Sequence, residues 1–241
     1  VEPIKPLIGY MAQRFSLYGE LTVMENLRFF SELYDVNPSE REARTERLLD
    51  FAGLTEFRSR RAAHLSGGMK KKLALASTLM HQPPILLLDE PTTGVDPVSR
   101  REFWDILTQL YAEGTTIVVS TPYMDEADRC SRVGLMYEGR LIRCDDPQVI
   151  RSEIEGDLIE LQAADWQAAR AKADAFPGVR EVQTYGESIH LLVDSADKRL
   201  PEIRERLEAE SIAYWGLRQA TPRMEEAFIS LIRRMDRERE A

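Results

Sequence analysis

Before Pro147, apolar residues recur either at helical spacing or as the unbroken runs of buried strands. Ile85–Asp89 is apolar up to its final acid, as in a parallel strand covered on both faces, and Thr115–Thr121 is β-branched and predicts a second buried strand. Thr22 with Glu25 forms a capping-box pattern ahead of an amphipathic helix over Val23–Tyr34, and Ser39 repeats the capping signal. The other predicted elements are a strand at Leu7–Gln13, helices at Ser39–Gly53, Ser66–His81, Asp96–Gly114 and Tyr123–Cys130, and a Val133–Tyr137/Arg140–Cys144 hairpin turned by Glu138-Gly139.

Strands that alternate with helices over residues 1–146 indicate an α/β domain. The composition changes near Pro147, and the later elements run in the order β-α-β-β-α-β, which is the ferredoxin-like pattern. A last helix begins at Thr221-Pro222. We therefore expect an α/β domain at 1–146 and a small α+β accessory domain at 147–241. The accessory elements are Leu158–Gln162, Trp166–Phe176, Glu181–Tyr185, Ile189–Asp194, Leu200–Glu210 and Ile212–Arg218.

Composition excludes some classes of function. The 241 residues are 43% hydrophobic and 30% charged, which is ordinary for a globular protein, and no apolar run approaches the length of a membrane helix. A formal net charge of −9 argues against broad nucleic-acid binding, so no nucleic-acid partner is expected. The three histidines, His64, His81 and His190, show no clustered carboxylate or cysteine and are expected to be structural or surface residues.

Two adjacent acids follow the apolar run. A buried strand delivers Asp89 and Glu90 to the carboxyl edge of the sheet, where ligands bind in open α/β folds. There Asp89 is placed to hold Mg²⁺ and Glu90 to polarise an attacking water, the two roles that phosphoryl transfer needs. The alternative is a strand that ends in a solvated acidic turn, and the pattern alone does not separate the two.

A Ser-Gly-Gly turn opens the helix before this strand. Ser66 is placed to cap the helix while Gly67 and Gly68 leave its first amides open, and such a helix start binds anions. For these three residues alone, an ordinary glycine turn is the better interpretation. The Lys70-Lys71-Lys72 run that follows is expected to be a solvated face rather than positive charge directed at a nucleotide.

The order and spacing of four segments closely resemble the ABC transporter ATPase family. They are Tyr10–Gln13, Leu65–Met69, Ile85–Glu90 and Gly94–Pro97. The resemblance implies that Gln13 is the Q-loop glutamine, which serves catalysis and Mg²⁺, and that Ser66, Gly67 and Gly68 are the nucleotide-binding signature motif. It makes Asp89 and Glu90 the end of Walker B, and it places Asp96 in the D-loop at the nucleotide.

This resemblance implies a P-loop NTPase-like core that uses ATP and Mg²⁺. Family members pair head to tail, so a second ABC ATPase domain is expected as partner, in an identical chain, a different chain or a tandem half. A membrane permease is the other expected partner, contacted by the helices between Gln13 and Ser66, which places the protein on the cytoplasmic face of the membrane. The tail Thr221–Phe228 resembles that of multidrug-efflux ATPases, which indicates export.

Two departures from the family pattern carry expectations of their own. The sequence contains no Gly-x₄-Gly-Lys-[Ser/Thr] phosphate loop (Walker A). We therefore expect this loop to lie upstream of Val1 in a longer polypeptide. The strand that should flank the acidic strand is expected upstream of Val1 as well. Pro122 stands where the family usually places a histidine that contacts the γ-phosphate. Proline has no donor to offer there, so we expect a half-site with impaired hydrolysis, and this chain alone to be inactive.

Two other functions stay open. A non-transport ABC ATPase that works on ribosomes is one, although such a protein needs a basic surface and this chain is acidic. A regulatory subunit that dimerises without turnover is the other. The sequence does not indicate the exported compound, because specificity in this family lies mostly in the permease.

Overall fold

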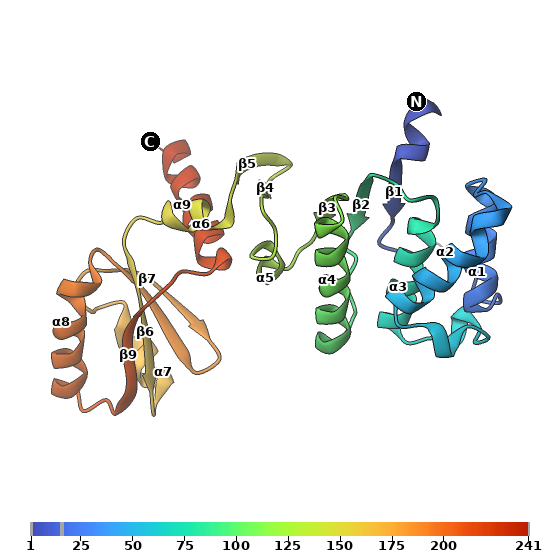
Figure 1. Ribbon diagram of the computed structural model, residues 1–241. Coiled ribbons are helices and arrows are strands. Elements are labelled where there is room, and N and C mark those ends of the chain that lie inside the picture. Colours follow the sequence, from blue (N-terminus) through green and yellow to red (C-terminus); the bar gives the residue numbers. More distant parts are fainter. Residues whose placement is uncertain (1, 15–16, 241) are drawn as a thin grey trace. The chain divides into compact units, whose positions relative to one another are not determined.

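The computed structural model describes residues 2–14 and 17–240 and divides into two compact units, Val1–Pro122 and Tyr123–Ala241 (Figure 1). The boundary expected at 146/147 therefore lies inside the second unit. The β-hairpin before residue 146 belongs to that unit because its apolar side packs with the C-terminal helix: Val133 and Leu135 share a buried cluster with Met224 and Ala227.

The first unit is built on a parallel sheet of three strands in the order β1-β2-β3, with bounds Ile8–Met11, Ile85–Asp89 and Thr116–Ser120. The central strand β2 pairs with both neighbours, so the expectation that the acidic strand lacks its flanking strand is wrong. In the described residues β3 pairs on one side only, and Val118 is 56% exposed. The prediction that this strand is fully buried is also wrong, since a β-branched run does not reveal how many neighbours a strand has.

Among its described residues this unit also has four α-helices: α1 (Val23–Leu33), α2 (Pro38–Phe51), α3 (Gly67–Thr78) and α4 (Pro97–Ala112). The capping box at α1 is confirmed, with Glu25 N donating to Thr22 Oγ1 and Thr22 N to Glu25 Oε2. The cap of α2 is Asn37 and not Ser39, because Ser39 N donates to Asn37 Oδ1 and Pro38 already has the φ of a first helical residue. Short 3-10 turns lie at Glu2–Leu7, Thr55–Phe57, Ala62–His64 and Leu79–His81.

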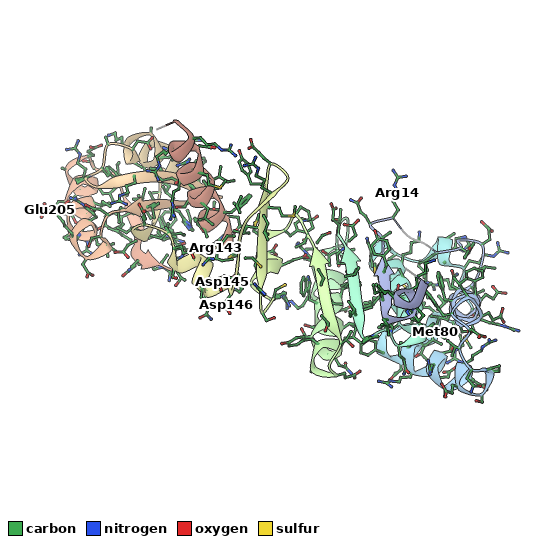
Figure 2. The ribbon with its side chains drawn as sticks, turned by 90° about the horizontal axis from the view of Figure 1, so that it is seen from above. Arg14, Met80, Arg143, Asp145, Asp146 and Glu205 are labelled. Atoms are coloured by element: carbon green, nitrogen blue, oxygen red, sulfur yellow. The ribbon has the colours of Figure 1, made fainter. Side chains whose placement is uncertain are left out.

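The second unit opens with α5 (Met124–Ala127) and a hairpin of β4 (Val133–Tyr137) and β5 (Arg140–Asp145). The Glu138-Gly139 turn is confirmed, and its φ values of 48° and 74° are those of a type I′ hairpin turn. Helix α6 (Pro147–Ser152) was not predicted. Figure 2 shows Arg143 beside Asp145 and Asp146, where β5 passes into α6; its guanidinium pairs with Asp145 at 2.9 Å and also with Glu153.

The rest of this unit is an antiparallel sheet in the order β7-β8-β6-β9, followed by helix α9. Helices α7 and α8 cover one face of the sheet, where Ile159, Leu191 and Ile203 are fully buried. The strands and helices follow one another in the predicted order. Their bounds are β6 Asp157–Ala163, α7 Trp166–Ala173, β7 Val179–Tyr185, β8 Ser188–Val193, α8 Ala196–Ala209, β9 Tyr214–Ala220 and α9 Met224–Glu240.

His190 contradicts the expectation that no histidine has a clustered carboxylate. Its ring is 3% exposed, and its Nδ1 lies 2.7 Å from Glu226 Oε1 on α9, which is also buried. Burial raises the pKa of Glu226, but the hydrogen bonds from His190 and from Arg223 N outweigh it and leave that pKa below its usual value. The partner is 36 residues away in sequence, beyond the reach of local patterns.

Among residues 2–14 and 17–240, no helix combines the length and apolar character needed to cross a bilayer.

Candidate functional site

Gln13 and Glu90 meet at the carboxyl edge of the parallel sheet. Gln13 lies two residues beyond β1 and Glu90 follows β2 directly. Gln13 Nε2 donates to Glu90 Oε2 at 2.6 Å, and the Thr93 hydroxyl donates to the same oxygen at 3.0 Å. Two donors on one oxygen set the direction of the carboxylate, as the function of a general base requires.

Asp89 is tied to the opposite neighbour of the central strand. Its Oδ1 accepts a hydrogen bond from Ser120 Oγ, the last residue of β3, at 2.6 Å. A backbone hydrogen bond also joins the two strands here, since Glu90 N donates to Ser120 O at 2.9 Å. The two adjacent acids therefore share one edge of the sheet, with Asp89 held from β3 and Glu90 held from the end of β1.

The backbone of Glu90 is in the left-handed region, with φ of 44°. A non-glycine residue held in this conformation costs about 1–3 kcal/mol and commonly marks a functional position. Pro91 follows directly and disfavours the right-handed helical conformation at the residue before it. The chain therefore turns sharply at Glu90 and presents the carboxylate at the sheet edge.

Lys71 overturns the expectation of a solvated lysine run. It is 3% exposed, and its Nζ donates to Gln13 O at 3.0 Å and to Glu90 O at 3.3 Å. Burial lowers the pKa of Lys71, although the charges of Glu90 and Asp89 partly oppose this shift. Lys72 instead pairs with Glu102 at the surface of α4.

The Ser66 turn (Leu65–Met69) begins α3, the helix that carries Lys71. Ser66 is exposed and caps the helix as predicted, with Met69 N donating to its Oγ at 3.2 Å. Gly67 is exposed, whereas Gly68 is buried against α4, where a Cβ would lie 2.5 Å from Ser99 Cβ. The turn therefore begins the helix that contacts the acidic strand end through Lys71.

The Asp96 loop (Thr92–Pro97) joins the acidic strand end to the Ser66 turn. A Cβ on Gly67 would be 3.6 Å from Gly94 O, so the two turns are neighbours. Asp96 is exposed and caps α4 by accepting a hydrogen bond from Ser99 N at 2.9 Å. This bond lowers the pKa of Asp96.

Pro122 lies two residues beyond β3 and is exposed. Like Gln13 and Glu90, it follows the carboxyl end of a parallel strand. Its ring offers no hydrogen-bond donor, and its backbone lacks an N–H.

The oxygens at this edge fit Mg²⁺ only as part of a mixed ligand set. Within the described ranges no cluster of three or more His, Cys, Asp or Glu residues could enclose a metal ion. Mg²⁺ typically takes one or two carboxylates and completes its shell with water and substrate phosphates. Asp89 and the side-chain oxygen of Gln13 match that partial set, so the site suits a metal that arrives with a phosphate ligand.

Sequence reasoning missed three residues of this site: Lys71, Thr93 and Ser120. A signal for Lys71 was present, because Gly68, Lys71, Leu75 and Thr78 recur at helical spacing and all are buried in α3. No comparable signal marks Thr93, although it lies three residues from Glu90, or Ser120, whose contact with Asp89 depends on the strand register.

Comparison with known proteins shows which family this chain is similar to. The model of the ABC transporter family matches residues 2–93. Over 229 residues the chain is 40% identical to the probable multidrug ABC transporter ATP-binding protein YbhF of Escherichia coli, covering 94% of this chain but 39% of that protein. It is 35% identical to the Nod factor export ATP-binding protein I of Burkholderia lata, covering 93% of this chain and 72% of that protein.

Solved structures agree in fold. CbiO1 of Clostridium perfringens, part of the ABC transporter complex cbiONQ, matches with a TM-score of 0.58 and 29% identity, over 63% of this chain and 62% of that one. The ATP-binding cassette MJ0796, a dimer in a post-hydrolysis state with ADP and Pi, matches with a TM-score of 0.53 and 27% identity, over 60% and 66% of the two chains.

Proposed function

Because the chain belongs to the ABC transporter ATP-binding protein family, we propose that it binds ATP and couples ATP hydrolysis to export across a membrane. The observation that carries this proposal is the oriented carboxylate of Glu90, held by Gln13 and Thr93 beside Asp89. Export is supported by the relatives, one named as a probable multidrug ABC transporter ATP-binding protein and another as a Nod factor export protein.

Each residue of the edge has a role in this proposal. Glu90 orients the attacking water and accepts its proton through the carboxylate that Gln13 and Thr93 direct. Asp89 and the Gln13 side-chain oxygen would hold Mg²⁺, which neutralises charge on the phosphates. Gln13 thus links the metal to the base, because its Nε2 already binds Glu90.

The Ser66 turn acts on a second nucleotide. Its exposed Ser66 and Gly67 would bind the γ-phosphate held by a partner ATPase domain through the amides and dipole of the helix start. Asp96 lies in the neighbouring loop and would contact the nucleotide across the same interface. The dimeric state of MJ0796 supports a pair of this kind.

Pro122 makes this half-site weak in hydrolysis. No donor from that position can reach a developing negative charge on the phosphate, and such donors typically contribute strongly to rate. The pair would then be asymmetric: this domain lends its Ser66 turn to a competent partner site.

The membrane partner is a permease on the side of α1. Tyr18 and Leu33 are 49% and 61% exposed there, so apolar side chains are available for such a contact. The protein would thus sit at the cytoplasmic face of the membrane. In the second unit we propose a ferredoxin-like accessory domain, supported by its β-α-β-β-α-β element order and its sheet order.

Glu90→Gln in the full natural protein tests the proposal. The amide keeps the size of the side chain but cannot accept a proton, so ATP turnover should fall by about 10²- to 10⁴-fold while ATP binding persists. Glu113→Gln, the same change at the exposed end of α4, is the control and should leave turnover unchanged. Unaltered turnover in Glu90→Gln would remove Glu90 from the mechanism and with it the main support for the proposal.

A further inference from the structure

Lys71 links helix α3 to both residues of the Gln13–Glu90 pair. Its ammonium donates to the carbonyl oxygens of Gln13 and Glu90, and the side chains of these same residues share the 2.6 Å hydrogen bond. We propose that Lys71 is a positioning residue, which fixes the two backbones so that Gln13 directs the Glu90 carboxylate before nucleotide binds. An effect of Lys71 on catalysis rests on the proposed function, but the positioning of the two backbones does not.

Both carbonyls lie just beyond the ends of their strands. Gln13 is two residues past β1, and Glu90 sits in a left-handed turn after β2. Thr93 N also donates to Glu90 O, at 3.3 Å. These part-buried carbonyls gain charge-assisted hydrogen bonds from the ammonium, which therefore stabilises a turn that is unfavourable by itself.

The side chain of a lysine fits the requirements of position 71. Lys71 shares the buried face of α3 with Gly68 and Leu75, whereas Lys72 points to Glu102. Its unbranched side chain carries three donors at one point, so it can reach two carbonyls from different strands at once. Burying an ammonium is costly, and an apolar residue would avoid that cost. The two carbonyl hydrogen bonds offset that cost, together with the nearby charges of Glu90 and Asp89.

The test compares Lys71→Met, Lys71→Arg and the control Lys70→Met. Met keeps the length and apolar stem but removes the donors, Arg keeps donors, and Lys70 is the adjacent residue outside the network. The first measurement is amide hydrogen–deuterium exchange of residues 88–94 in ligand-free protein, which needs no activity. Loss of a charge-assisted hydrogen bond should speed exchange there by about tenfold or more in Lys71→Met, with near-normal rates in the other two variants.

The second measurement is steady-state ATP hydrolysis by the full natural protein. Lys71→Met should lower kcat by about tenfold or more with KM changed less than about threefold, because it misdirects the base without removing a nucleotide contact. Lys71→Arg should restore most of kcat. If Glu90→Gln leaves turnover unchanged while exchange at 88–94 still rises in Lys71→Met, the proposed function fails and the positioning stands.

Two results would overturn the inference. One is unchanged exchange at residues 88–94 in Lys71→Met. The other is faster exchange spread evenly over α3 and the sheet, with a lower melting temperature and no rescue by Arg, which would make Lys71 a general folding residue.

Discussion

Replacing Gly68 by alanine tests how tightly the Ser66 turn is held against α4. A Cβ at Gly68 would lie 2.5 Å from both Ser99 Cβ and Ser99 Oγ. Carbon atoms in good contact are separated by about 3.5–4.0 Å, so the helices would have to part by about 1 Å. The hydroxyl can rotate away, but Ser99 Cβ is fixed to the backbone of α4 and cannot.

Two opposing terms set the size of the effect. Overpacking of this kind typically costs about 1–3 kcal/mol. Alanine is favoured over glycine in a helix by about 0.5–1 kcal/mol, and Gly68 lies inside α3. We therefore expect a net loss of about 0.5–2 kcal/mol in the free energy of unfolding of the first unit.

The assay follows Trp104, which is 5% exposed on α4. The other two tryptophans, Trp166 and Trp215, belong to the second unit, so replacing both by phenylalanine makes Trp104 the sole fluorescent reporter of urea unfolding. Gly67→Ala is the matched control, because its added Cβ would meet Gly94 O at an ordinary 3.6 Å. Adding Ser99→Gly to Gly68→Ala should recover most of the loss, a coupling of about 0.5–3 kcal/mol. Equal stabilities for Gly67→Ala and Gly68→Ala, or no coupling with Ser99, would refute the packing argument.

Two further predictions concern pH and turnover. Burial, with the charges of Glu226 and Glu225, raises the pKa of Tyr185 to about 12 from its ordinary 10.0, so the folded state retains a proton that the unfolded chain releases. The stability contributed by Tyr185 should be complete below pH 10.0 and disappear as the pH rises towards 12. In urea titrations, the free energy of unfolding of Tyr185→Phe should therefore fall less over this pH range than that of the unsubstituted protein. An identical fall in both proteins would contradict this prediction. Pro122→His in the full natural protein should raise ATP turnover by on the order of tenfold, since it adds a donor near the developing charge, and no gain would refute the weak half-site.

Features set by neighbouring residues could be predicted from the sequence. The Thr22–Glu25 capping box, the Asp96-Pro97 helix start and the Glu138-Gly139 turn all occur where the pattern indicated. Each depends on side chains and backbone groups within four positions of one another, so the local sequence contains the whole interaction. Two local errors remain: the cap placed at Ser39, which lies two positions from the true cap Asn37, and helix α6, whose Asp146-Pro147 start resembles that of α4.

Features set by pairing across the fold could not be predicted in this way. Apolar character alone did not distinguish β2, which has a neighbour on each side, from β3, which is paired on one side among the described residues. His190 and Glu226 lie 36 positions apart and meet only because α9 packs against the sheet. Lys71 is the intermediate case, since its position on the buried face of α3 was visible but its acceptors were not.

The Gln13–Glu90 contact could not be predicted from the sequence because it depends on strand register. In the parallel pair β1–β2, Met11 lies opposite Leu88. Continuing that register by two positions brings Gln13 level with Glu90, although 77 residues separate them in the chain. A shift of one residue would place Gln13 level with Asp89 or Pro91 and turn its side chain away from that of Glu90, because side chains alternate along a strand. The same register that buries Leu86 and Leu88 therefore places the amide of Gln13 on the carboxylate of Glu90. A single strand register thus determines both the packing of the core and the geometry of the site.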